Sequence, residues 1–360
     1  MLIEENRPLA PFTTLGIGGP ARWFAVASSE DDVAEAAVWA RDNRVALFVL
    51  GGGSNLLVAD AGFNGLVLHV GLCGVGVRNS VDANQQVLYQ VAAGEDWDSF
   101  VEHAVNDNCA GIECLAGIPG TVGGTPVQNV GAYGQEVASS IESVRAFDLH
   151  ESEIVELTAA ECGFEYRRSR FNSKDCGRYI VTRVDYRLTR DGAPTLRYAD
   201  LQRAFAAGSD PSLKEVAAAV RRIRQSKGML LVEGDPDCRS AGSFFKNPVV
   251  TEEQVQRIAV VSGKQPPRFP AGAGTANDGR VKVPAAWLIE QAGFAKGYTL
   301  GAAGISQRHT LALINRGGAT AKDLLALAEQ VNSVVQDRFG IRLQMEPVMV
   351  GFDQPRAERI

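Results

Sequence analysis

Hydrophobic and polar residues follow two alternating periods along the first hundred residues. Short runs typical of β-strands occur at 22–26, 46–50, 66–70 and 87–93. Between the first two runs, Ser29 and Asp32 form a capping-box sequence that opens a helix ending near residue 43. A second helix is expected over about 96–108. Strands that alternate with helices in this way predict a mixed α/β or α+β domain.

The rest of the chain continues the mixed pattern. The portion from about 143 to 188 is rich in strand-forming residues, with 179–182 as its clearest run. A helix is expected to open at Asp210 and Pro211, because apolar residues recur after them at helical spacing. Towards the C-terminus the pattern predicts helices at 252–262 and 284–292, a strand at 310–315, a long helix capped by Thr320 and Asp323, and a final strand at 342–350.

Composition narrows the class of protein. At 360 residues the chain is too long for one ordinary core, so two or three domains are expected. A net charge of −6 argues against nucleic acid as a partner. No apolar run is long enough to span a membrane and the first residues carry no signal segment, so we expect a protein of the cytoplasm. Six scattered cysteines, with no Cys-x-x-Cys pair and no nearby histidine set, favour neither a metal site nor a disulfide framework.

Three glycine-rich segments are candidates for ligand binding. Residues 16–21 match the letters of a dinucleotide fingerprint, but Pro20 stands where the helix should start, so a Rossmann domain is not expected. The segment 51–57 follows a predicted strand directly, and its successive N–H groups suit an anion-binding nest for a pyrophosphate. The segment 116–134 combines glycines, small residues and amides in a long irregular loop that suits a flat cofactor. Tight turns alone are the alternative.

The eight residues 241–248 place a hydroxyl, two aromatic rings, a cation and an amide in one short segment. Gly242 allows the backbone to approach a ligand closely, and Ser243 presents a hydroxyl that can donate or accept a proton. Lys246 and Asn247 offer donors to an anionic ligand, and Pro248 fixes the end of the segment. A buried turn with aromatic filler is the alternative reading. The chain shows no Walker sequence and no Ser-His-Asp arrangement, so hydrolysis is not favoured.

Several of these segments occur together, and in the same order, in one family of flavoenzymes. The chain resembles UDP-N-acetylenolpyruvoylglucosamine reductases over essentially its whole length. The resemblance rests on 13–19, 51–57, 117–134, 166–169, 242–248, 287–291 and Glu346. It implies an α+β fold, with a two-lobed FAD-binding domain of the vanillyl-alcohol-oxidase type and a third domain that binds the substrate. The implied division is 1–72 with 347–360 for lobe 1, 73–227 for lobe 2, and 228–346 for the substrate domain.

The family's chemistry is a reduction in two stages. NADPH reduces a non-covalently bound FAD, whose N5 then delivers hydride to the enolpyruvyl ether of UDP-N-acetylglucosamine. A proton added to the neighbouring carbon completes the lactyl group of UDP-N-acetylmuramate, a precursor of peptidoglycan. The resemblance therefore implies an NADPH-dependent oxidoreductase whose partners are small molecules. We expect it to act as a monomer.

Three residues match the family's catalytic positions. Arg167 corresponds to the arginine that binds the substrate carboxylate, a task suited to a permanently charged planar group. Glu346 corresponds to the carboxylate that supports the enolic form. Ser243 corresponds to the proton donor, which is chemically feasible because the carbanion it meets is a strong base.

Other matches concern binding. Tyr198 lies in a segment similar to the tyrosine-bearing loop of one subgroup of the family. Lys227 and Asn247 match contacts to the substrate diphosphate, and Gln291 is a weaker candidate. The residues expected to contact FAD are Gly51, Gly52, Gly53, Ser54, Asn55, Leu56, Gly94, Ile118, Pro119, Gly120, Thr121, Gly123, Gly124, Gln128, Asn129, Gly131, Ala132 and Tyr133.

The sequence departs from the family pattern around Glu346. Gln344 replaces a carboxylate, Pro347 removes a backbone donor, and Val348 stands where arginine is common. These changes leave Glu346 as the only acid available for its role.

Two other functions fit parts of the pattern. A carbohydrate or lactone oxidase on the same flavin fold is one, although such enzymes often tether flavin through a His or Cys that 51–57 lacks. A non-catalytic protein that has kept a nucleotide-sugar pocket is the other. The presence of Ser243, Arg167 and Glu346 together argues against it, because binding alone requires no proton donor.

Overall fold

The computed structural model describes residues 1–79, 85–206, 208–270 and 279–352, and the chain forms two compact units. The first comprises Met1–Glu5, Trp23–Gly52 and Gly65–Ser226, and the second comprises Asn6–Arg22, Gly53–Asn64 and Lys227–Ile360. The three-part division expected from the sequence stays a prediction, and residues 353–360 of its first lobe lie outside the described residues.

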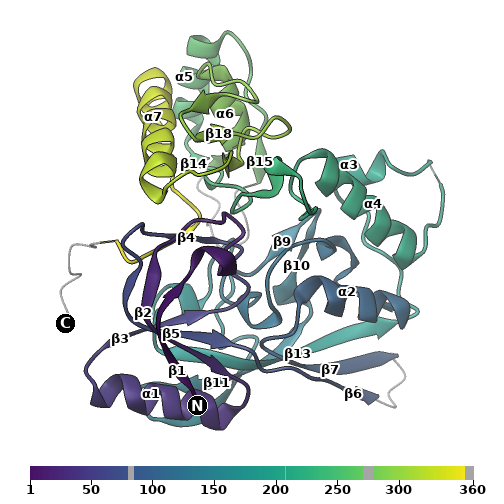
Figure 1. The fold of residues 1–360 in the computed structure, drawn as a ribbon. Helices are drawn as coiled ribbons and strands as arrows, with labels where there is room; N and C mark the ends of the chain where they lie inside the picture. The colour runs from purple at the N-terminus through teal and green to yellow at the C-terminus, as the bar shows by residue number, and fades with distance from the viewer. Residues whose placement is uncertain (80–84, 207, 271–278, 353–360) are drawn as a thin grey trace. The chain divides into compact units, whose positions relative to one another are not determined.

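The first unit is built on an antiparallel sheet in the order β12-β11-β13-β7-β6 (Figure 1). Its strands are β6 (Val75–Asn79), β7 (Gln86–Ala92), β11 (Ile141–Asp148), β12 (Glu153–Thr158) and β13 (Tyr179–Arg190), and β8 (Cys109–Ala110) pairs with the end of β13. Helix α2 (Trp97–Asn106) packs its Trp97 and Phe100 rings against Tyr186 of β13. The predicted helix and the predicted strand at 87–93 are therefore confirmed.

A second sheet has the order β1-β2-β5-β3. Its strands are β1 (Ile3–Pro8), β2 (Pro20–Ala27), β3 (Ala46–Leu50) and β5 (Phe63–Val70), with β3 and β5 parallel. Helix α1 (Glu30–Asp42) joins β2 to β3, and the Ser29 hydroxyl accepts a hydrogen bond from the Asp32 amide, which is one half of the predicted capping box. The Asp32 carboxylate accepts from the Ser28 amide at 2.9 Å. Helices α3 (Ala199–Gln202) and α4 (Leu213–Ser226) complete this unit, α4 starting slightly later than predicted.

The second unit gathers three helices around small sheets. They are α5 (Glu252–Ser262), α6 (Ala285–Gln291) and α7 (Ala321–Phe339), and α5 and α7 each begin with a capping box. Two three-stranded sheets accompany them: β14 (Val249–Val250), β16 (Val281–Lys282) and β15 (Phe269–Pro270), and β17 (Thr299–Leu300), β18 (Ala303–Ile305) and β19 (Leu313–Asn315). Leu324, Leu327, Ala328, Val331 and Val335 of α7 are fully buried, as the helical spacing predicted.

The final predicted strand is shorter than expected. Only β20 (Val348–Val350) is formed, and it pairs in parallel with β4 (Leu56–Val58). The residues before it pair instead with 244–246, because the Glu346 amide donates to the Phe244 carbonyl at 2.9 Å and the Lys246 amide donates to the Gln344 carbonyl at 2.9 Å. Pro347, which has no N–H, stands between the two pairings. Among the described residues, no helix has the length and apolarity needed to cross a membrane.

Candidate active site

Two glycine segments meet backbone to backbone within the first unit. A Cβ placed on Gly52 would lie 2.5 Å from the Gly120 Cα and 2.9 Å from the Thr121 amide nitrogen, while one on Gly51 would lie 2.8 Å from the Thr121 hydroxyl. Real Cβ atoms do not approach other atoms so closely. Residues 51–52 and 120–121 of the two predicted ligand-binding segments therefore lie against each other.

This junction fits a polar, flat ligand. The Thr121 hydroxyl is buried and makes no hydrogen bond within the part of the chain that the structure describes. A buried hydroxyl without a partner costs free energy, and a ligand that accepts its proton would remove that cost. Together with the small Gly51 and Gly120 beside it, the hydroxyl fits the residues expected to hold FAD.

Gly94 and Gly123 are required by close packing. The Gly94 amide donates to the Leu72 carbonyl at 2.8 Å, and a Cβ at Gly94 would lie 2.7 Å from the backbone of residues 71 and 72. The Gly123 amide donates to the Ala93 carbonyl at 2.8 Å. Gly94 packs the chain after β7 against residues 71 and 72, and Gly123 brings the second glycine segment against Ala93. The small size of both glycines is therefore needed whether or not they contact a cofactor.

Arg167 is attached to the same long loop. Its Nη2 donates to the Gly131 carbonyl at 2.7 Å, and its guanidinium carbon lies 5.5 Å from the Tyr166 ring centre. Arg167 also has a φ of 55°, in the left-handed region that non-glycine residues seldom adopt. The loop itself is held by Asn129, whose Nδ2 donates to Glu136 Oε2 and to the Glu165 carbonyl, both at 3.0 Å.

The basic end of α4 is only partly a solvated cluster. Arg224 is buried and its Nε donates to the Gly117 carbonyl at 2.8 Å. Burial lowers the pKa of this arginine, while the nearby Tyr133 opposes the shift. Arg221 pairs with Asp98 at 2.7 Å, and Asp98 also accepts from the Gly117 amide. The sequence alone did not predict that Arg224 supports the second glycine segment.

The second unit brings Ser243 and Glu346 to one place. Gly242, with φ of +71°, turns the chain before Ser243, and the Phe244 amide donates to the Leu311 carbonyl at 2.8 Å. The pairing of Phe244 with Glu346 described above fixes Ser243 one residue from the point where the two segments join. Ser243 is half-buried.

Asn55 and Asn247, two further residues predicted to bind ligands, make hydrogen bonds within the same unit as Ser243 and Glu346. Asn55 Nδ2 donates to the Glu346 carbonyl at 3.3 Å, and the Asn55 carbonyl accepts from the Val348 amide at 2.9 Å. Asn247 Oδ1 accepts from the Ala285 amide at 2.9 Å, so this side chain caps α6, the helix whose last residue is Gln291. The Asn247 Nδ2 group is thereby turned to face away from the helix end.

Lys227 lies near a half-buried histidine that the sequence did not single out. Burial, together with the positive charges of Lys227 and Lys296, lowers the pKa of His309 to about 4. The imidazole is therefore neutral at physiological pH, and its Nδ1 accepts from the Leu311 amide at 3.1 Å. The same Leu311 accepts a hydrogen bond from the Phe244 amide through its carbonyl. His309 is therefore linked through Leu311 to the residue that follows Ser243.

The predicted residues are divided between the two units. The first holds Gly51, Gly52, Gly94, Tyr198, Arg167 and the predicted cofactor residues from Ile118 to Tyr133, and the second holds Gly53, Ser54, Asn55, Leu56, Lys227, Ser243, Asn247, Gln291 and Glu346.

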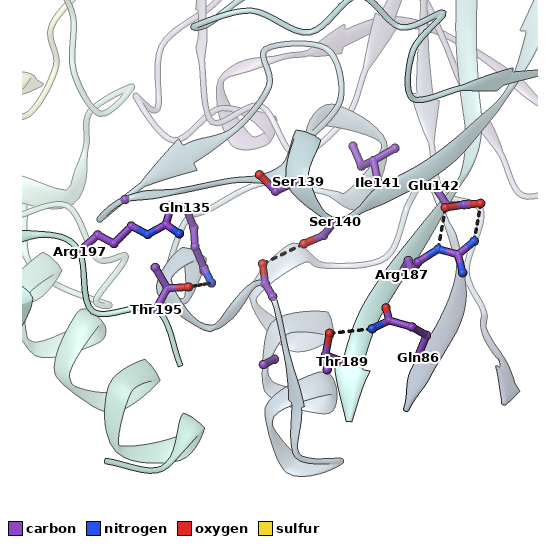
Figure 2. A pocket seen from close by; sticks show the side chains of 13 residues that line it. Gln86, Gln135, Ser139, Ser140, Ile141, Glu142, Arg187, Thr189, Thr195 and Arg197 are labelled. Carbon is purple, nitrogen blue, oxygen red and sulfur yellow. Dashed lines mark hydrogen bonds and ion pairs between the residues drawn. The ribbon is translucent and has the colours of Figure 1, made fainter. Parts of the chain in front are cut away.

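A pocket of about 350 Å³ lies elsewhere in the first unit (Figure 2). Its walls are mostly polar and include the ion pair of Arg187 with Glu142 and the Gln86–Thr189 hydrogen bond. None of the predicted catalytic residues lines it. Among the described residues no group of acidic, His or Cys side chains is arranged to hold a metal ion.

Comparison with known proteins identifies the class and then the family. Residues 21–158 match the family model described as an FAD binding domain, so the converging glycine segments belong to a flavoprotein. Residues 235–350 match the model of the UDP-N-acetylenolpyruvoylglucosamine reductase C-terminal domain. The chain is 48% identical to the UDP-N-acetylenolpyruvoylglucosamine reductase of Thermobifida fusca, over 96% of this chain and 98% of that protein. It is 46% identical to that of Streptomyces coelicolor, over 96% and 90%.

A solved structure agrees with these relatives. The crystal structure of the UDP-N-acetylenolpyruvylglucosamine reductase from Thermus caldophilus superposes with a TM-score of 0.64 at 27% identity, covering 97% of this chain and 99% of that chain. The chain therefore belongs to the UDP-N-acetylenolpyruvoylglucosamine reductase family. The family, the fold class and the FAD cofactor expected from the sequence are confirmed, and the oxidase alternative is not favoured.

Proposed function

We propose that this protein reduces the enolpyruvyl ether of UDP-N-acetylglucosamine to UDP-N-acetylmuramate, with NADPH as the source of electrons. The observation that carries the proposal is the second unit's placement of Ser243 beside the backbone of Glu346. Relatives that share nearly half of the residues over almost the whole chain carry the name of this activity. When bound, FAD supplies the hydride that it has taken from NADPH.

The cofactor is held, on this proposal, by the converging glycine segments of the first unit. Thr121 donates its buried hydroxyl to the cofactor, and Gly51, Gly52 and Gly120 let the backbone approach it. No covalent tether is expected, because 51–57 contains neither His nor Cys. Arg224 supports this arrangement by fixing the Gly117 carbonyl.

Three side chains act on the reacting group. Arg167, whose Nη2 donates to the Gly131 carbonyl, binds the substrate carboxylate and so stabilises the negative charge that develops there. Glu346 supports the enolic form. Ser243 donates the proton to the carbon next to the carboxylate. The next residue, Phe244, is held by backbone hydrogen bonds to Leu311 and Glu346, which limits the reorganisation that the Ser243 hydroxyl needs.

The nucleotide part of the substrate is bound, on this proposal, by the residues that match the family's binding positions. Lys227 and the Asn247 Nδ2 group bind the diphosphate, Tyr198 contacts the nucleotide side, and Gln291 adds a further contact. The neutral His309 next to Lys227 adds no charge of its own, so Lys227 and Lys296 carry the positive charge there. We further propose that the protein acts as a monomer in the cytoplasm.

Separate measurement of the two half-reactions tests this function. Anaerobic NADPH should bleach the yellow holoenzyme, and the enolpyruvyl substrate should restore the colour faster than air does. In Ser243→Ala, bleaching should stay fast while reoxidation by substrate slows by several orders of magnitude, on the order of the contribution of a positioned proton donor. Reoxidation by oxygen alone would indicate an oxidase. Equal losses in both half-reactions would refute the role of Ser243.

A further inference from the structure

A fully buried carboxylate lies between the second glycine segment and the tyrosine-bearing loop. Glu113 has 0% of its surface exposed and sits in the short helix η2 (Glu113–Leu115) of the first unit. Its Oε1 accepts from Gln135 Nε2 at 2.7 Å and from the Thr195 amide at 2.8 Å, and its Oε2 accepts from the Gly111 amide at 2.8 Å. No cation pairs with Glu113 among the described residues, so these N–H groups alone compensate its burial.

Neighbouring groups bind the same point of the loop. Gln135 Oε1 accepts from the Cys114 amide at 2.8 Å, and Gln135 Nε2 also donates to Thr195 Oγ1 at 3.3 Å, a contact visible in Figure 2. The Cys114 thiol donates to the Thr195 carbonyl at 3.1 Å. The amide, carbonyl and hydroxyl of Thr195 are thus all bound. We call Glu113, Cys114, Gln135 and Thr195 the Glu113 cluster.

Tyr198 follows Thr195 by three residues. The residue is 41% exposed, and its ring meets the Tyr133 ring edge-on, with ring centres 5.4 Å apart. Tyr133 lies two residues before Gln135, so both sides of this ring contact are anchored by the Glu113 cluster. Helix α3 starts directly after Tyr198 and has only four residues, which is too short to be stable alone. The anchor at Thr195 therefore contributes to the position of Tyr198.

We propose that Glu113 is a positioning residue for substrate binding. It fixes the base of the segment 195–198 to the segment 133–135, so that Tyr198 is in place before the nucleotide arrives. A loop that is ordered in advance binds with a smaller loss of conformational entropy. This inference rests on the proposed function, because it takes Tyr198 as a substrate contact. Glu113 itself touches neither the substrate nor the reacting atoms.

The substitution Glu113→Gln is the sharpest perturbation. The amide oxygen of the new Gln can accept either from Gln135 and Thr195 or from Gly111. In either orientation its NH₂ group faces the N–H donors that the oxygen does not reach, and the two groups repel each other. The dissociation constant of the enolpyruvyl substrate is measured on the oxidised holoenzyme from the flavin absorbance. It should rise about tenfold, the effect of losing one or two hydrogen bonds to a buried charge. Bleaching by NADPH should be unchanged.

A double-mutant cycle separates positioning from general damage. If Glu113 acts through Tyr198, then Glu113→Gln weakens substrate binding in the wild-type background and has no further effect in Tyr198→Ala. Equal effects in both backgrounds would overturn the inference, as would unchanged binding in Glu113→Gln. Thr195→Val removes only the hydroxyl that binds Gln135, so it gives the same test with less risk to folding. Its effect on substrate binding should be smaller and should also vanish in the Tyr198→Ala background. An effect that persists in Tyr198→Ala counts against the inference.

Asp148→Asn is the matched control. Asp148 is also a buried carboxylate of the first unit, 1% exposed, which accepts from the His150 amide and from Arg178, outside the tyrosine-bearing loop. Asp148→Asn should leave substrate affinity unchanged. A rise in the dissociation constant comparable to that of Glu113→Gln would show that loss of any buried carboxylate has this effect, and it would contradict the inference. Wild-type holoenzyme that fails to turn over the enolpyruvyl substrate would instead contradict the proposed function.

Discussion

Replacement of Gly52 by alanine tests whether the two glycine segments must touch. Gly52 does not adopt the left-handed backbone conformation, so its dihedral angles accept an alanine without strain. The only cost is space, because the new methyl group would lie 2.5 Å from the Gly120 Cα and 2.8 Å from the Gly120 carbonyl carbon. Both are backbone atoms, which cannot move aside as a flexible side chain does.

The size of the effect follows from this contact. An ordinary contact for a Cβ begins near 3.4 Å, so the segments must separate by about 0.9 Å. Overpacking of this kind costs about 1–3 kcal/mol. The displacement also moves the Thr121 hydroxyl and the neighbouring amides by a large fraction of a hydrogen-bond length, so FAD affinity should fall at least about tenfold.

Flavin release gives a direct assay of Gly52→Ala. FAD fluorescence recovers when the cofactor leaves the protein, so a titration gives the dissociation constant, and thermal unfolding with and without added FAD separates binding from folding stability. Gly76→Ala on β6 is the control, since its new methyl group would lie at an ordinary contact distance of 3.7 Å from Gln90 of β7. If Gly52→Ala binds FAD as tightly as the wild type and unfolds at the same temperature, the close approach is not required.

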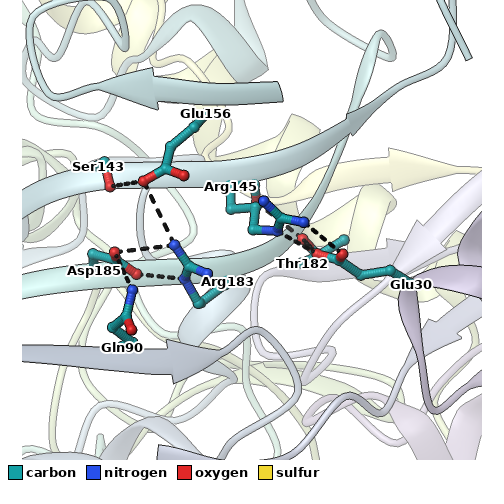
Figure 3. Close-up of polar contacts among 8 residues, drawn as sticks. All are labelled: Glu30, Gln90, Ser143, Arg145, Glu156, Thr182, Arg183 and Asp185. Atoms are coloured by element: carbon teal, nitrogen blue, oxygen red, sulfur yellow. Dashed lines mark hydrogen bonds and ion pairs between the residues drawn. The ribbon is translucent and has the colours of Figure 1, made fainter. Parts of the chain in front are cut away.

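The remaining predictions concern pH. Hydrogen bonds from Arg145 and then Thr182 lower the pKa of Glu30 (Figure 3), so this group stabilises the fold above its unfolded pKa and the contribution is lost as pH falls. Glu30→Gln should cost up to about 1 kcal/mol at neutral pH and nothing at low pH, measured by urea unfolding. The lowered pKa of His309, about 4, means that stability should fall as pH drops from 6.5 towards 4, because only the unfolded chain then takes up a proton. His309→Gln should flatten the unfolding free energy over that range, and an unchanged slope would contradict a buried neutral imidazole.

Local signals in the sequence determined most of the elements. The caps at Ser29 and Thr320 each bind a group three residues away, and α5 has the predicted bounds, because helix starts depend on residues close in the chain. The roles of Ser243, Arg167 and Glu346 come from the resemblance to the family and stay predictions. Where long-range pairing decides, the sequence was less informative: the predicted strand at 342–350 shrank to Val348–Val350.

Only the tertiary structure decided which polar groups lose contact with water. Arg224 looks like one of several exposed cations, yet it is buried on the Gly117 carbonyl, 107 positions away. Glu113 and Thr195 are 82 residues apart, and nothing near either of them in the chain indicates that they bind each other. The physical reason is that burial, and the hydrogen bonds that compensate it, depend on segments brought together by folding, whereas propensity and capping act within a few residues.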